Sequence, residues 1–446
     1  MQTLLGIFLV GVTLAVLAIM IRDAVRGTTP LISLRNVFLS GVLIFQTVSG
    51  AITALGDVTE KGAELSYPVS SCAAFCLVIT LFIVVFLLTY RLVDLDMRAQ
   101  LRSCTRSVTD GRLVAVGMMV LTIGLAMRFA GAGLPILEKL LPQMAAGALA
   151  AAVMLLSYVW IRNPFNPIFG FFLLIGAALS AGALLVDAFG RRELLGVGLA
   201  SVWGFYQGRW KSGSAISLAR RLAIGGAVAF IPVVLFSAVR TSINDRRTAA
   251  EQVERVLELD FRAIEEATIG MLSGQFAAGV SMWTYETRPG DFAVDPLHSL
   301  AFFFAMPVPR DLWPGKPDGL GLLLVDQALL NGVSSGHSWG PGLVGHLFHD
   351  FVYISLPLYA FILGAVLKYL DQRVQYSSGD PLTLACFGAA LGQVIGLPRG
   401  ELGLFAFNMV TAMVGARFAM ALGPVFLVPR LPRIDTTSPF VPVSAP

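Results

Sequence analysis

Uninterrupted apolar runs recur along the chain, and charged or turn-forming residues bound most of them. A helix that crosses a bilayer needs about 20 mostly apolar residues. Eleven runs approach this length, near residues 3 to 21, 36 to 55, 71 to 90, 113 to 130, 144 to 161, 166 to 186, 194 to 208, 222 to 239, 351 to 368, 382 to 398 and 402 to 422. The pattern predicts an all-α, polytopic integral membrane protein with about eleven transmembrane helices.

One connection is far longer than the others. We expect residues 1–239 to form eight transmembrane helices, 240–350 one large loop, 351–428 three further helices and 429–446 a loose tail rich in Pro, Ser and Thr. Within the loop, apolar residues recur every three or four positions from Val253 to Ile264, with glutamates between them. This spacing predicts an amphipathic helix that lies on the membrane or on the other helices.

Composition supports a membrane protein. The 446 residues are 56% hydrophobic and 13% charged, whereas soluble domains carry about 25% charged residues. A water-soluble globule is therefore excluded. The net charge of +4 is small for this length, and no basic tract predicts a nucleic-acid partner.

Lysine and arginine are unevenly divided between the two sides of the expected bundle. If the N-terminus is outside, the cytoplasmic segments hold 17 of them and the short outer loops hold six. Since cytoplasmic loops carry the excess of Lys and Arg, we expect an extracytoplasmic N-terminus and a cytoplasmic C-terminus. The large loop then lies outside, and so do all four histidines.

Five arginines on the outer side go against this bias. Arg191 and Arg192 follow one expected helix, Arg240 follows another, Arg310 lies in the loop, and Arg399 lies between the last two helices. If they converge, they form a cationic pocket suited to phosphate, because guanidinium binds phosphate oxygens in bidentate fashion. In the alternative interpretation, each of them reaches the membrane surface or pairs with a nearby carboxylate.

The most distinctive string runs Met306-Pro-Val-Pro-Arg-Asp-Leu-Trp-Pro-Gly-Lys-Pro317. Four prolines fix φ and remove backbone donors, which predicts a stiff extended strap. Trp313 suits a membrane interface, and the strap would present Arg310 and Lys316 on a rigid support. A purely structural lid would also explain the string.

Two types of residue near the outer surface could transfer protons. His337 precedes Trp339 by two positions, and Glu401 follows Arg399 by two. Either side chain could be a general base, although Glu401 could instead form a simple ion pair with Arg399. His346 and His349 have a spacing that could hold a metal on a helix, but no third close ligand is evident, so we expect no metal site and no cofactor.

Several of these strings together resemble a known family. The segment Pro309–Pro317, the Gly-rich stretch to Gly345 and the helix end Leu367-Lys-Tyr-Leu-Asp371 look like the Wzy class of bacterial polysaccharide polymerases. Gly190-Arg-Arg192, Val239-Arg240 and Pro398-Arg-Gly-Glu401 also fit, and the enterobacterial common antigen polymerases are the most similar pattern. The resemblance is best over residues 190 to 420.

This resemblance implies a GT-C-like membrane glycosyltransferase at the periplasmic face of the bacterial inner membrane. The enzyme would move a growing glycan from undecaprenyl pyrophosphate onto a lipid-linked oligosaccharide repeat unit, as in O-antigen or common-antigen biosynthesis, without a metal or a nucleotide sugar. Its partners would be the two lipid-linked sugars, membrane lipid and, as a candidate, a chain-length regulator of the Wzz class.

The corresponding roles are hypotheses. Arg240 and Arg399 would hold the pyrophosphate, with Arg191, Arg192, Arg310 and Lys316 next in order. Glu401 would be the first candidate base and His337 the second, while Trp313 and Trp339 would stack on sugar rings. An O-antigen ligase would use the same donor, and a transporter or flippase of lipid-linked sugars is the alternative of another class.

Overall fold

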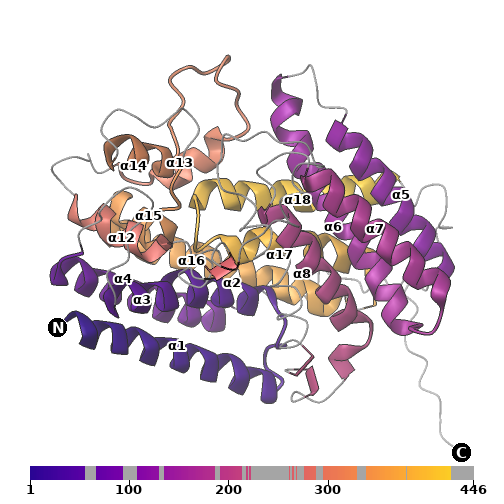
Figure 1. The fold of residues 1–446 in the computed structure, drawn as a ribbon, viewed down its shortest axis with the longest axis horizontal. Helices are drawn as coiled ribbons and strands as arrows, with labels where there is room; N and C mark the ends of the chain where they lie inside the picture. Colours follow the sequence, from indigo (N-terminus) through magenta and orange to yellow (C-terminus); the bar gives the residue numbers. More distant parts are fainter. Residues whose placement is uncertain are drawn as a thin grey trace, which may run out of the picture.

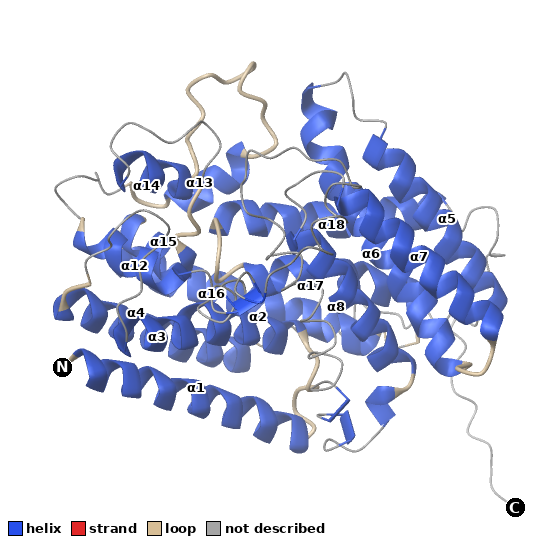
Figure 2. Ribbon diagram, in the orientation of Figure 1, coloured by secondary structure: helices blue, strands red, loops and turns tan. Residues whose placement is uncertain are grey.

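A computed structural model describes most of the chain. It covers residues 1–55, 67–93, 108–129, 135–185, 191–212, 217–218, 220–221, 261, 264–265, 268, 276–287, 295–328, 338–377 and 379–422. All regular elements in these ranges are helices (Figure 2). They are α1 (Gln2–Val25), α2 (Leu34–Val42), the π-helix η1 (Leu43–Val48), α3 (Ser49–Leu55), α4 (Val69–Leu92), α5 (Asp110–Phe129), α6 (Pro135–Arg162), α7 (Pro167–Leu185), α8 (Arg191–Gly208), the 3₁₀ helix η2 (Trp210–Ser212), α12 (Ala277–Glu286), α13 (His298–Ala305), α14 (Leu320–Ala328), α15 (Gly342–His349), α16 (Val352–Tyr376), α17 (Pro381–Gly396) and α18 (Leu402–Leu422).

Eight helices in the described part are long and apolar enough to cross a membrane, and each coincides with one of the expected runs. The polytopic helical class is therefore confirmed. The other three expected runs remain predictions. α17 has 16 residues, about 24 Å at 1.5 Å per residue, and α8 begins with three charged residues. The run near 222–239 lies outside the described residues.

Helix α6 contacts α5, α7, α8, α17 and α18, whereas α1 packs on α3 and α16 on α4 (Figure 1). Alanines fill the middle of α6 and are buried. A Cβ added at Gly147 would lie 2.1 Å from the carbonyl oxygen of Ala412 in α18. Small residues allow helix backbones to approach this closely in a membrane. The close contact with α6 therefore fixes the position of α18.

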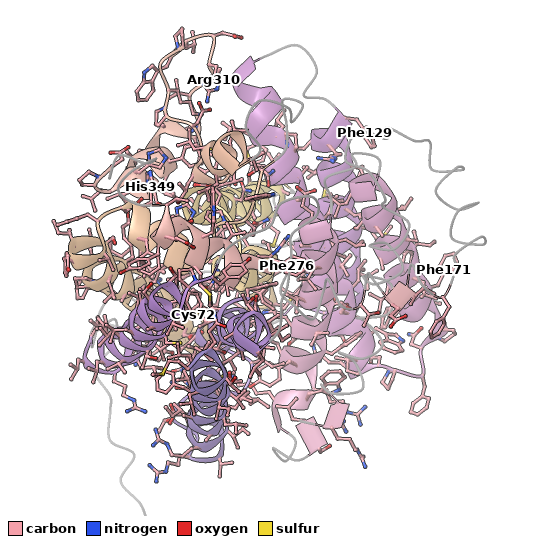
Figure 3. All side chains as sticks on the ribbon, turned by 60° about the vertical axis from the view of Figure 1, so that its left-hand side comes forward. Cys72, Phe129, Phe171, Phe276, Arg310 and His349 are labelled. Atoms are coloured by element: carbon pink, nitrogen blue, oxygen red, sulfur yellow. The ribbon has the colours of Figure 1, made fainter. Side chains whose placement is uncertain are left out.

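The short helices α12 to α15 gather at one end of the molecule, next to α4 and α16 (Figure 1). The strap that includes Arg310 projects beyond them (Figure 3). Nearly all of the amphipathic stretch expected from Val253 lies outside the described residues. The described part of the large loop thus forms a helical cap on the bundle.

A buried polar cluster lies at the other end of the helices. The Asp371 carboxylate accepts hydrogen bonds from Leu34 N (2.8 Å), Arg35 N (3.1 Å) and the Tyr90 hydroxyl (2.8 Å). The Arg35 side chain is 1% exposed and pairs with Asp23 at 2.8 Å. This cluster joins α1, α2, α4 and α16, and it leaves the histidines at the opposite end.

Candidate functional site

The turn between α17 and α18 is the foundation of the candidate site. The carbonyl oxygen of Pro398 accepts hydrogen bonds from Gln46 Nε2 (2.6 Å) and Leu343 N (2.9 Å). Gln46 lies in the π-helix of the second span, and such irregularities are frequent at functional sites. Arg399 follows in the same turn, with its guanidinium carbon 5.9 Å from the centre of the Phe45 ring. Three segments distant in sequence therefore fix the position of Arg399.

Gly342 permits the tight approach between α15 and η1. Its φ is +68°, a value that favours glycine. A Cβ at this position would lie 2.4 Å from Gln46 Nε2. Any larger residue would disturb the hydrogen bond that holds the turn.

Glu401 lies at the start of α18 and is 8% exposed. Its Oε2 atom accepts a hydrogen bond from Gly321 N at 3.0 Å. Its Oε1 atom has no hydrogen-bond partner among the described residues and lies 3.5 Å from His346 Nε2. A buried acceptor without a donor is costly, so Oε1 is an unsatisfied polar atom at the start of α18.

His346 is fully buried and connects three elements. Its Nδ1 lies 2.6 Å from Ser299 Oγ in α13, and its Nε2 accepts from Leu402 N at 3.1 Å. Burial lowers the pKa of His346 below its ordinary value, although the nearby carboxylates of Glu401 and Asp350 oppose this effect. The imidazole is therefore neutral at pH 7.

Asp350 anchors the neighbouring chain. Its Oδ2 accepts from Ser299 N (2.8 Å) and from the Tyr359 hydroxyl, and its Oδ1 lies 3.2 Å from His349 Nδ1. Burial alone would raise the pKa of Asp350, but the hydrogen bonds from His349, the Tyr359 hydroxyl and Ser299 N bring it below its ordinary value. We call Ser299, His346, His349, Asp350, Tyr359 and Glu401 the histidine–carboxylate cluster.

Strained backbone surrounds this cluster. Within the described ranges, three residues other than glycine have positive φ: Phe276 (60°), Leu297 (64°) and Phe351 (68°). Each lies directly before a helix, namely α12, α13 and α16. Such conformations cost free energy and occur preferentially at functional sites.

The strap was expected to present both Lys316 and Arg310 to a ligand, but the two side chains differ. Lys316 is 7% exposed, and its ammonium donates to the carbonyl oxygens of Met306 (3.1 Å) and Val308 (3.0 Å). The prediction that Lys316 presents its charge to a ligand is therefore corrected, because this charge stabilises the strap itself. Arg310 is more exposed and pairs with Asp318.

The two tryptophans also differ. Trp313 is 45% exposed on the strap, as a sugar-stacking residue requires. Trp339 is 7% exposed and packs edge-on against Trp283, with ring centres 5.9 Å apart. It belongs to a small apolar cluster with Leu320 and Leu324, so the expectation of an open stacking surface at Trp339 is corrected.

Some candidate residues cannot be placed. Arg240 and His337 lie outside the described residues, as do the side chains of Arg191 and Arg192. The convergence of the outer arginines therefore stays a prediction. The structure does bring Arg399 and Glu401 into one turn.

No pattern in the sequence pointed to Ser299 or Tyr359, because hydroxyl residues in apolar helices are common. His346 and His349 were notable for their metal-like spacing, yet the part of the chain that the structure describes contains no group of three potential ligands that could hold a metal. Their ring nitrogens contact Ser299, Leu402 and Asp350 instead.

The fold and the site define a multi-pass helical membrane protein with a buried histidine–carboxylate cluster under a helical cap. Comparison with protein families, with curated proteins and with solved structures finds no match.

Proposed function

We propose that this protein is a polysaccharide polymerase of the Wzy type, a membrane glycosyltransferase that acts on lipid-linked sugars. The observation that carries the proposal is the arrangement of Arg399 and Glu401, a cation and a partly unpaired carboxylate, in one turn below a proline-rich strap. The resemblance of these segments to that class supports it. The outer, periplasmic location rests on the charge asymmetry of the loops.

The reaction assigns a role to each group. An acceptor sugar hydroxyl attacks the anomeric carbon of the donor, a new glycosidic C–O bond forms, and the bond to undecaprenyl pyrophosphate breaks. Glu401 takes the hydroxyl proton, and negative charge develops on the departing pyrophosphate. Arg399, together with Arg240, stabilises this charge; one positioned donor contributes about 2.7 to 4 kcal/mol in a water-poor site.

The proposed reaction explains why only one of the two carboxylate oxygens of Glu401 accepts a hydrogen bond. Oε2 is held by Gly321 N, which orients the carboxylate. Oε1 keeps its lone pairs for the acceptor hydroxyl. Trp313 on the strap would bind the sugar from the other side, as aromatic rings stack on apolar sugar faces.

The test is the polymer made by cells and by purified protein with lipid-linked repeat units. We expect Arg399→Ala and Glu401→Gln each to reduce the rate by about 10²-fold or more, while Arg399→Lys separates point charge from bidentate binding. Arg373→Ala, at the opposite end of α16, is the matched control, and membrane insertion is checked for all variants. Normal polymer length in both Arg399→Ala and Glu401→Gln would refute the proposal. Transfer to lipid A core in place of a repeat unit would instead identify a ligase.

A further inference from the structure

The hydrogen bonds of His346 determine which ring nitrogen carries the proton. Leu402 N can only donate, so Nε2, at 3.1 Å, must accept. Nδ1 then carries the hydrogen and donates it to Ser299 Oγ at 2.6 Å. This arrangement also rules out Ser299 as a nucleophile activated by His346, because the nitrogen that faces the hydroxyl has no free lone pair.

The same nitrogen faces Glu401. Oε1 lies 3.5 Å from Nε2, but the neutral ring has no hydrogen there to give. The carboxylate therefore keeps one oxygen bound to Gly321 N and the other without a hydrogen bond among the described residues. Protonation of Nε2 would give this nitrogen a hydrogen that Oε1 could accept.

We infer that His346 is a positioning residue that keeps Glu401 able to accept a proton, and that protonation of His346 inactivates the site. This inference rests on the proposed function, in which Glu401 is the base. A proton on Nε2 would point at the N–H of Leu402 and remove the acceptor from the first turn of α18. Glu401 Oε1 is the acceptor within reach, so an ion pair would form and occupy the lone pairs that the sugar hydroxyl needs. The ring gains one proton from solvent, which forms the Nε2–H bond, and no other covalent bond changes.

The charged groups around His346 determine the pH at which its ring becomes protonated. Glu401 at the start of α18 and Asp350 before α16 favour the protonated ring, while His349 and His298 oppose it when they are charged. Complete burial is the largest effect, and it brings the pKa of His346 below 6.5. The site is therefore active at neutral pH and loses activity in acid.

Glutamine at position 346 provides the first test. Its amide can donate to Ser299 and accept from Leu402 but does not titrate in this range. We expect His346→Gln to keep most of the activity at pH 7.5 and to shift the acid limb of the kcat profile to lower pH. His346→Ala should lose activity about 10²-fold, because Leu402 N loses its acceptor and the start of α18, next to Glu401, is no longer held. His298→Gln is the control, in which the acid limb should persist. An unchanged acid limb in His346→Gln would overturn the inference.

A second measurement does not need polymerase activity. Folding favours neutral His346, so its contribution to stability is present above pH 6.5 and is lost as the pH falls from 6.5 toward the lower folded pKa. The thermal midpoint of the purified protein should therefore fall with pH in this window, and less so in His346→Gln. In Glu401→Gln the protonated ring loses its partner, so the decline should extend to lower pH.

The two measurements separate the two ideas. If the wild-type protein makes no polymer, or if Glu401→Gln makes normal polymer, but the thermal midpoints follow this pattern, the proposed function fails and the His346–Glu401 coupling stands. If wild type and both variants show the same dependence of the midpoint on pH, the coupling is wrong, whatever the reaction.

Discussion

The carboxylate of Asp371 joins α16 to α2 and α4 through hydrogen bonds at the end of the bundle opposite the candidate site. It is 3% exposed and accepts three hydrogen bonds, from Leu34 N, Arg35 N and the Tyr90 hydroxyl. Two of these donors are backbone groups of the first turn of α2, where a negative charge is favourable. Asp371→Ala would leave all three donors buried without an acceptor.

The cost can be estimated from these contacts. Each unsatisfied buried donor costs about 1 to 3 kcal/mol, and removal of one member of a buried charged network costs about 3 to 5 kcal/mol in total. Tyr90→Phe removes one hydrogen bond and leaves the two backbone donors satisfied, so we expect about 1.5 kcal/mol. Asp371→Asn, which keeps the volume and one acceptor oxygen, should lie between them.

The assay is thermal unfolding of the purified protein in detergent, followed by tryptophan fluorescence. At about 2 °C per kcal/mol, near the lower limit for large domains, Asp371→Ala should lower the midpoint by about 6 to 10 °C and Tyr90→Phe by about 3 °C. A midpoint for Asp371→Ala within the error of wild type would refute the reasoning. An equal effect of Tyr90→Phe would also refute it, because the backbone donors would then contribute nothing.

Two further predictions concern packing and topology. Gly342→Ala should lower the free energy of unfolding by about 2 to 4 kcal/mol, since it adds strain at positive φ to a clash with Gln46. Gly27 has the same φ of +68° and nothing within 4 Å of an added Cβ, so Gly27→Ala should lower it by only about 1 to 2 kcal/mol. Equal midpoints of the two variants in thermal unfolding would contradict this difference. In a cysteine-free background, Trp313→Cys should react with a membrane-impermeant maleimide in intact cells and Lys211→Cys only after permeabilisation, and the reverse pattern would invert the proposed orientation.

Hydropathy alone determined the class of protein and the position of most helices. Eight expected runs agree with helices of sufficient length, because a bilayer requires a continuous apolar segment and that requirement is local in sequence. Glu401 was also identifiable, from its position two residues after Arg399. The limits of local information appear at α17, a helix of 16 residues of which 14 are buried, because its length lies below what a bilayer span needs.

Only the tertiary structure decided what surrounds Glu401. The contact between Glu401 and His346 joins residues 55 positions apart, and the hydrogen bond between Gln46 and Pro398 joins residues 352 positions apart. No periodicity predicts such pairs, since they depend on which helix ends meet. The same packing turned Lys316 and Trp339 inward, away from the roles that their residue types suggested. Apolar length is a one-dimensional property that lipid imposes on each segment, whereas a buried polar site forms only after close helix contacts bring distant donors and acceptors together.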